Sequence, residues 1–159
     1  MLYLGKTTKT HGIKGELKFY SEASFKEKVL KKDFPVYIKE QKHLISSVRI
    51  HKNHYLITID NLLDINAVEQ FRNQNIYIKK EDLELSENEV LIEELVGFEV
   101  FESELSLGKV VDIMYNKTGL LLRVQGKKSF LLPYQEIFIQ KIDKNQKIIH
   151  VQNAKGLIL

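Results

Sequence analysis

Apolar and polar residues alternate over many short stretches of the chain, and few stretches follow a helical repeat. Leu17 and Phe19 alternate with polar neighbours in residues 16–20, a period of two that is typical of a strand with one buried face. Similar segments predict strands at residues 2–6, 36–39, 43–51, 55–59, 75–79, 98–102, 108–115, 120–124, 130–133, 139–143 and 147–151. Short strands separated by polar turns predict a mainly β chain, folded as two small antiparallel β-barrels.

One segment departs from this pattern. Ile65, Val68 and Phe71 recur at helical spacing after Asp64, whose carboxylate suits the N-cap position of a helix. We therefore expect a short helix from residue 65 to about residue 73, with its apolar stripe plugging an open end of the first barrel. Residues 25–30 read as a polar connection of helical character.

The segments between the predicted strands suggest the domain boundaries. We place a first domain at residues 1–82, an acidic linker at 83–89 and a second domain at 90–159. The linker contains neither Pro nor Gly, so we expect it to be partly ordered. In the second domain, residues 103–107 are predicted as a hairpin loop, and Pro133 should end its strand because it cannot donate to a ladder.

Composition limits the class of protein. The chain has 159 residues, of which 43% are hydrophobic, enough to build a core. There is no cysteine, so disulfides and thiolate metal sites are excluded. No apolar run approaches the ~20 residues that span a bilayer, and the amino terminus lacks the layout of a signal peptide. These features fit a cytoplasmic protein.

The charge is unevenly distributed along the chain. Residues 1–82 carry 15 Lys and Arg against 10 Asp and Glu, a net charge of +5, whereas residues 83–159 carry 9 against 11, a net charge of −2. A basic first half and a slightly acidic second half predict two surfaces with different partners.

The first half contains a glycine-rich segment, GKTTKTHGIKGELKFY at residues 5–20. Gly12 and Gly15 favour a tight, shaped loop, because glycine tolerates positive φ and close backbone approach. The candidate functional residues of this loop are Lys9, His11, Gly12, Lys14, Gly15 and Lys18. They could present cations to phosphate groups or form an ordinary hairpin with solvated charges. The segment is not a P-loop, because its glycine spacing is too short.

Other polar groups offer little evidence of chemistry. His51 and His54 could suggest metal ligation, but surface histidines are the simpler interpretation, because no acidic or Cys partner follows at ligand spacing. Glu93 and Glu94 are neighbours on one segment, so they do not converge as a general acid and base must. The lysines within residues 26–32 could contact RNA or be solvated. No catalytic residue, cofactor site or metal site is predicted.

Two segments together carry a resemblance to a known family. THGIKGELKFY at residues 10–20 resembles the amino-terminal signature of the ribosome maturation factor RimM family. LVGFEVFESELSLGKVVDIMYNKTGLLLRV at residues 95–124, FLLPYQEIFIQKID at 130–143, KIIHV at 147–151 and GLI at 156–158 resemble its carboxy-terminal PRC-type barrel. The resemblance extends over essentially the whole chain, in the order and spacing of the family.

The resemblance implies a non-enzymatic factor without a cofactor, expected to be monomeric and not membrane-bound. It implies a translation-factor-like first barrel and a PRC barrel that binds the small-subunit head protein numbered nineteen, to assist maturation of the 3′ head domain of 16S rRNA. An aromatic pair that the family carries before the PRC barrel is here Val90-Leu91. Large flat side chains are typical interface anchors, so two alternatives are open for the protein contact. Either Val90 and Leu91 keep it with weaker anchoring, or its weight moves to nearby residues such as Phe98 and Tyr134.

Three hypotheses from different classes follow. The first is an assembly factor that bridges ribosomal RNA and a ribosomal protein. The second is a stand-alone RNA-binding barrel with the second barrel as a spacer, which predicts that residues 1–82 alone bind RNA as tightly as the full chain. The third is an enzyme, which would need a phosphate-gripping loop and a metal-holding acidic pair, and the sequence shows neither arranged.

Overall fold

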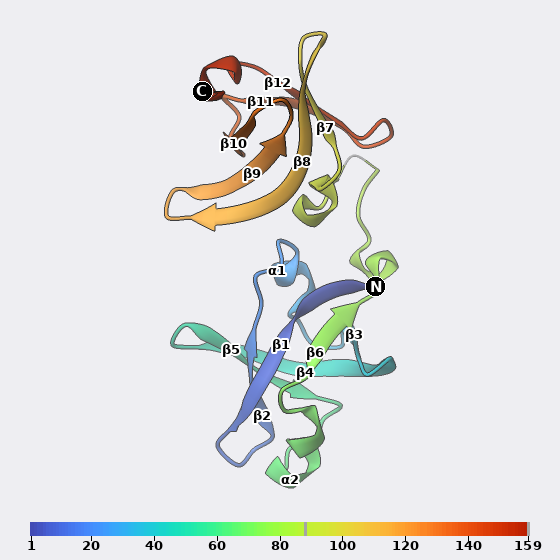
Figure 1. The fold of residues 1–159 in the computed structure, drawn as a ribbon. Helices are drawn as coiled ribbons and strands as arrows, with labels where there is room; N and C mark the ends of the chain where they lie inside the picture. The colour runs from blue at the N-terminus through green and yellow to red at the C-terminus, as the bar shows by residue number, and fades with distance from the viewer. Residues whose placement is uncertain (88, 159) are drawn as a thin grey trace. The chain divides into compact units, whose positions relative to one another are not determined.

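A computed structural model of the chain describes residues 1–87 and 89–158. The chain divides into two compact units, Met1–Ser86 and Glu87–Leu159. Each unit consists mainly of short strands with a few helices of one turn or less (Figure 1). The prediction of a mainly β chain built from two small sheets is therefore confirmed. Within the part of the chain described, no helix is both long enough and apolar enough to cross a membrane.

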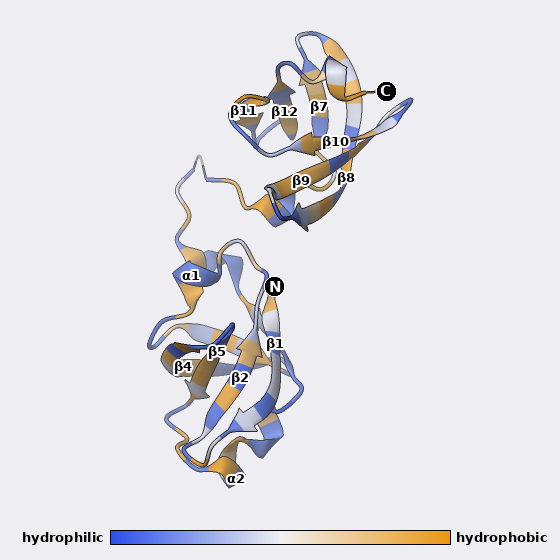
Figure 2. Cartoon of the chain, turned by 90° about the vertical axis from the view of Figure 1, so that its left-hand side faces the viewer, coloured by the Kyte–Doolittle hydropathy of each residue, from blue (hydrophilic) through white to orange (hydrophobic). Residues whose placement is uncertain are grey.

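Six antiparallel strands close the first unit into a barrel. They are β1 (Leu2–His11), β2 (Glu16–Tyr20), β3 (Pro35–Ile38), β4 (Gln41–His51), β5 (His54–Ile59) and β6 (Asn75–Ile78), arranged in the order β1-β2-β5-β4-β3-β6. The alternation predicted for β2 buries Leu17 and Phe19 in the barrel core, and Figure 2 shows the same alternation of apolar and polar residues along this strand. The period of two thus sets which side chains fill the barrel.

Strand β1 is longer than the predicted strand at residues 2–6. It continues to His11 through a polar run, because β2 offers it backbone partners, including Thr10 opposite Leu17 and His11 opposite Glu16. Thr7 on this strand is fully buried, and its hydroxyl donates to the carbonyl of Phe71 and accepts from the amide of Gln74. Backbone pairing with β2 and the hydrogen bonds of the Thr7 hydroxyl therefore keep this segment in a strand despite its polar composition.

The predicted helix at residues 65–73 is shorter and changes type. Helix α2 (Ile65–Val68) is followed directly by a 3₁₀ turn, η1 (Glu69–Phe71). The expected N-cap is confirmed, because Oδ1 of Asp64 accepts a hydrogen bond of 2.8 Å from the amide of Asn66. Val68 and Phe71 are buried, and α2 lies at one end of the first unit in Figure 1. The first unit also contains α1 (Lys26–Val29) and η2 (Lys80–Leu83).

Leu83 lies in the segment predicted as a linker at residues 83–89. Its side chain is buried at the end of η2, so this residue packs with the first unit. The division between the two units falls after Ser86. One apolar side chain is enough to attach the first part of the acidic segment to the preceding unit, because its burial removes apolar surface from water.

The second unit forms a six-stranded sheet in the order β10-β9-β8-β7-β12-β11. Its elements are η3 (Ile92–Leu95), β7 (Glu99–Glu102), β8 (Leu105–Asn116), β9 (Gly119–Gln125), β10 (Ser129–Pro133), β11 (Ile139–Asp143), β12 (Ile148–Val151) and η4 (Lys155–Leu157). The strands enclose a single apolar core that includes Val100, Val124 and Leu132. As predicted, β10 ends at Pro133.

Two features of this sheet differ from the prediction. First, β7 and β12 pair in parallel, with Val100 opposite Ile149, so the sheet is not wholly antiparallel. These strands are distant in sequence, so no hairpin turn sets their relative direction. Second, β8 begins at Leu105 rather than at residue 108, because Leu105 pairs with Glu102 of β7. The predicted hairpin loop at residues 103–107 is correspondingly shorter.

Candidate functional site

The glycine-rich segment forms the β1–β2 hairpin, whose turn is residues 12–15. Gly12 and Gly15 both have positive φ angles, of 67° and 86°, as the sequence indicated. Gly15 also packs closely on a neighbouring loop, since a Cβ atom built there would lie 2.2 Å from the carbonyl oxygen of Leu62. The hairpin turn is therefore held against the backbone of residues 62–63.

The predicted cations of the hairpin divide into two groups. Lys9 and Lys14 are exposed on the hairpin, whereas His11 and Lys18 are half-buried. The ring of His11 lies 4.8 Å from the ring of His51, measured between ring centroids. The structure thus brings His11 and Lys18 next to the β4–β5 hairpin and leaves Lys9 and Lys14 in solvent.

The β4–β5 hairpin contributes further basic groups that the sequence did not connect to the loop. The His51 and His54 rings are 5.6 Å apart, and the His54 ring lies 5.7 Å from that of Tyr20. We use the term basic cluster for His11, Lys18, Arg49, His51, Lys52 and His54. The antiparallel pairing of β1 with β2, of β2 with β5 and of β5 with β4 brings these residues together.

Burial and mutual repulsion affect the protonation of this cluster. Partial desolvation, followed by the nearby positive charge of His11 and Lys52, lowers the pKa of His51 below its ordinary value. Desolvation and Lys18 lower the pKa of His54 in the same way. Both imidazoles therefore favour the neutral form. Within residues 1–87 and 89–158, no three His, Cys, Asp or Glu residues gather as potential metal ligands.

A carboxylate is built into the same surface. Glu16 accepts two hydrogen bonds from Arg49, of 2.7 Å from Nε and 2.8 Å from Nη2. These bonds lower the pKa of Glu16 even though its burial acts in the opposite direction. Such a bidentate pair has a fixed geometry. It ties the end of the glycine-rich hairpin to β4 and neutralises the carboxylate within the basic cluster.

The four predicted protein contacts of the second unit have different degrees of burial. Leu91 and Phe98 are only 6% and 4% exposed, so their side chains fill the interior. Val90 and Tyr134 are partly exposed and pack against the same core. Burial raises the pKa of Tyr134 above its ordinary value. Val90 and Tyr134 are thus the two of the four that retain exposed surface.

The second unit also exposes apolar side chains that sequence reasoning missed. Val111 and Tyr115 on β8 and Leu131 on β10 are exposed. Leu131 is opposite Arg123 of β9, which is opposite Asp112 of β8. The register of β8 shifts between Val110 and Asp112, which interrupts simple alternation. Because of the bulge, a period-two reading does not identify which side chains of β8 are exposed.

The two units correspond to two family domains. The sequence model of the RimM N-terminal domain matches residues 2–83, and that of the RimM PRC barrel domain matches residues 92–157. The chain belongs to the RimM family. Membership agrees with the resemblance inferred from the hairpin and PRC-type segments.

Relatives of the RimM family match the chain over nearly its full length. The ribosome maturation factor RimM of Exiguobacterium sibiricum is 34% identical, over 99% of this chain and 97% of that protein. That of Bacillus subtilis is also 34% identical, over 98% of this chain and 95% of that protein. A crystal structure of a 16S ribosomal RNA processing protein RimM from Pseudomonas aeruginosa is 18% identical and covers 97% of this chain and 98% of that one, with a TM-score of 0.42.

Proposed function

We propose that this RimM-family protein is a ribosome maturation factor that assists assembly of the small-subunit head without catalysing a reaction. The observation that carries this proposal is the match of both family domains, in order, over almost the full chain. In the finer proposal, the factor binds the small-subunit head protein numbered nineteen and the 3′ domain of 16S rRNA.

The first unit is proposed to contact the RNA. Its residues carry the net positive charge of the chain, and the basic cluster places Lys18 and Lys52 around the β1–β2 and β4–β5 hairpins, next to three histidines and to Arg49, which is paired with Glu16. Lys9 and Lys14 extend the basic surface into solvent, and Gly12 and Gly15 shape the turn between them. Phosphate attraction of this kind is independent of RNA sequence and weakens with salt.

The second unit is proposed to contact the head protein. Val90 and Tyr134 present partly exposed apolar surface and pack against the core that contains Phe98, and Leu91 is buried. Tyr134 is the aromatic group among these four residues that retains exposure, so it is the proposed anchor. Val90 and Leu91 offer less contact area than an aromatic pair, which predicts weaker protein binding.

The proposed mechanism is a shift in the populations of assembling states. A protein that binds RNA and a head protein together stabilises arrangements in which the two are correctly placed. Only the difference in affinity between correct and incorrect arrangements matters, and a few kcal/mol is enough. No covalent step is involved.

A binding measurement with the full chain tests the protein side. We expect isothermal titration with the purified head protein to show a complex, which Tyr134→Ala weakens about 10-fold or more, as expected for an anchor residue. Tyr115→Ala, which removes an exposed tyrosine of the same unit, is the matched control and should change the affinity little. Absence of binding by the unmodified chain would contradict the proposed partner, and retained RNA binding would then favour a stand-alone RNA-binding barrel.

A further inference from the structure

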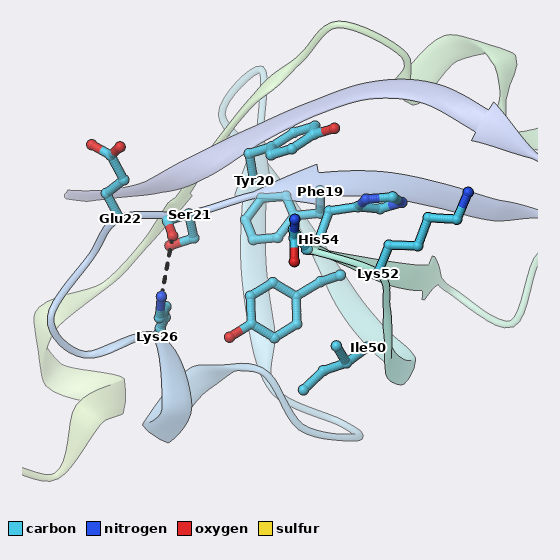
Figure 3. A pocket seen from close by; sticks show the side chains of 10 residues that line it. Phe19, Tyr20, Ser21, Glu22, Lys26, Ile50, Lys52 and His54 are labelled. Carbon is cyan, nitrogen blue, oxygen red and sulfur yellow. Dashed lines mark hydrogen bonds between the residues drawn. The ribbon is translucent and has the colours of Figure 1, made fainter.

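A hollow on the first unit lies beside the basic cluster. It has a volume of about 410 Å³, and its lining includes Tyr20 of β2, Lys26 of α1, Ile50 of β4, Lys52, and His54 and Tyr55 of β5 (Figure 3). The volume falls within the range of ~300–1,000 Å³ that is typical of small-ligand sites. All of the lining residues belong to one unit, so the hollow is a property of the barrel itself.

Apolar and aromatic groups of this hollow face solvent. Tyr20 is 49% exposed and Ile50 is 73% exposed, although both are residues that usually favour burial. The Tyr20 and His54 rings are tilted by 37° with centroids 5.7 Å apart. Exposed aromatic faces of this kind can stack against any of the bases, and an exposed apolar cluster is a common sign of a binding surface.

Cations flank the aromatic groups. Lys26 and Lys52 project from different sides of the hollow in Figure 3. Nζ of Lys26 donates to the carbonyl of Ser21 at 3.5 Å and lies 5.9 Å from the centroid of the Tyr55 ring. Glu22 is the one carboxylate of the lining, against two lysines. The balance favours an anionic ligand, and Lys18 of the basic cluster adds to it from the same face of β2 and β5.

One polar atom at this site lacks a partner. Nε2 of His54 is buried and has no hydrogen-bond partner among the described residues. Buried polar groups are usually paired with a donor or acceptor, and His54 in the lining of the hollow carries a nitrogen that the described residues leave unpaired. A nucleotide offers such groups on its base edges and ribose hydroxyl.

We propose that this hollow binds one unpaired nucleotide of a single-stranded RNA. Its base would stack on Tyr20 beside His54, and the phosphates on either side would meet Lys26 and Lys52. The inference rests on the proposed function, because it names the form of RNA that the first unit takes. A base inside a duplex cannot enter a hollow, so the site selects unstacked nucleotides.

The test compares two RNA probes with the full chain. A labelled six-nucleotide single strand and a hairpin duplex with a similar number of phosphates are titrated by fluorescence anisotropy. We expect tighter binding of the single strand, and Tyr20→Ala should weaken it about 5-fold to 100-fold, with little effect on the duplex. Tyr20→Phe should retain binding. Tyr3→Ala, which removes an exposed tyrosine of the same barrel, is the matched control.

The lysines give a second, independent readout. Lys52→Gln should reduce the slope of log Kd against log salt for the single strand by about 0.7, the value for one lost phosphate contact. Tyr20→Ala should leave this slope unchanged. Lys42→Gln, an exposed lysine of β4 outside the lining, should leave both the single-strand affinity and its slope near those of the unmodified chain.

Three outcomes would overturn the inference. They are equal affinity for the two probes, an equal loss of affinity for both probes in the Tyr20→Ala variant, and binding of free nucleoside monophosphate as tightly as the single strand. Lys52→Gln changes an exposed residue of the same lining, so its salt slope still tests the inference if Tyr20→Ala lowers the melting temperature. Co-sedimentation of the full chain with ribosomal precursors separates the two proposals. If the chain co-sediments with ribosomal precursors but shows no preference for single strands, the proposed role of the hollow is wrong and the proposed function stands.

Discussion

The three histidines of the basic cluster show how neighbouring side chains set the protonation of a surface. His11 belongs to the β1–β2 hairpin, and His51 and His54 belong to the β4–β5 hairpin. The His51 ring lies beside the other two, with ring centroids 4.8 Å from that of His11 and 5.6 Å from that of His54. Because one protonated imidazole opposes another, the cluster resists full protonation. A bound polyanion would relieve this repulsion.

The lowered pKa values of His51 and His54 predict a pH dependence of stability. In the unfolded chain both imidazoles return to a pKa of about 6.5, so at mildly acidic pH the unfolded state binds more protons than the folded state. The free energy of unfolding of the first unit should therefore fall as the pH decreases from about 7.5 to about 5.5. The lowered pKa of Glu16 does not oppose this trend, because its carboxyl is ionised in both states within this range.

Thermal unfolding, followed by NMR signals of first-unit residues, measures this effect. We expect the melting temperature to fall on acidification, and the double variant His51→Gln, His54→Gln to show a flatter profile. His150→Gln in β12 of the second unit is the control and should leave the profile of the first unit unchanged. A melting temperature of the unmodified first unit that stays constant or rises on acidification would contradict the assignment.

At the scale of elements, the β1–β2 hairpin depends on its two glycines in different ways. Gly12 has a φ of 67° but open space around it, whereas Gly15 has a φ of 86° and touches the backbone of Leu62. A side chain costs about 1–2 kcal/mol in a left-handed conformation. At Gly15 it also forces the hairpin away from residues 62–63.

Alanine substitutions separate these two costs. Gly12→Ala should reduce the free energy of unfolding by about 1–2 kcal/mol, and Gly15→Ala by about 2–5 kcal/mol, because overpacking adds to the backbone strain. Urea unfolding of the full chain measures both values. Equal effects of the two substitutions would show that the contact with Leu62 does not hold the turn in place.

The elements also show where sequence patterns are informative. The strands with simple alternation, such as β2, and the N-cap at Asp64 follow from local chemistry and were predicted correctly. The polar half of β1, the parallel pairing of β7 with β12 and the bulge in β8 depend on partners that are distant in sequence. Local patterns do not record which strand lies alongside, so these features could not be predicted.

At the scale of the whole molecule, the residue types of the candidate site were visible but their grouping was not. From the sequence, Lys18 and His11 are assigned to one hairpin, and His51 and His54 are interpreted as surface histidines with no connection to it. Only the barrel order places these residues, and the hollow next to them, on neighbouring strands. Similarly, Leu91 was proposed as a contact because of its position in the family pattern and Phe98 because it lies nearby in the sequence, and their burial depends on packing that the sequence does not report.

The two units differ in charge as well as in topology. The basic barrel suits a polyanion, and in the proposed function the slightly acidic second unit would suit a basic protein partner. If each unit binds one partner, both units are necessary for function. A stand-alone RNA-binding barrel would make the second unit dispensable.

The most direct test of this account is co-sedimentation of the purified full chain with small ribosomal subunits on sucrose gradients. Immature subunits that contain precursor 16S rRNA are compared with mature subunits at equal concentration. The account predicts that the protein migrates with the immature particles and much less with the mature ones, since an assembly factor must release its product. Absence from the immature particles, or equal occupancy of both, would contradict it.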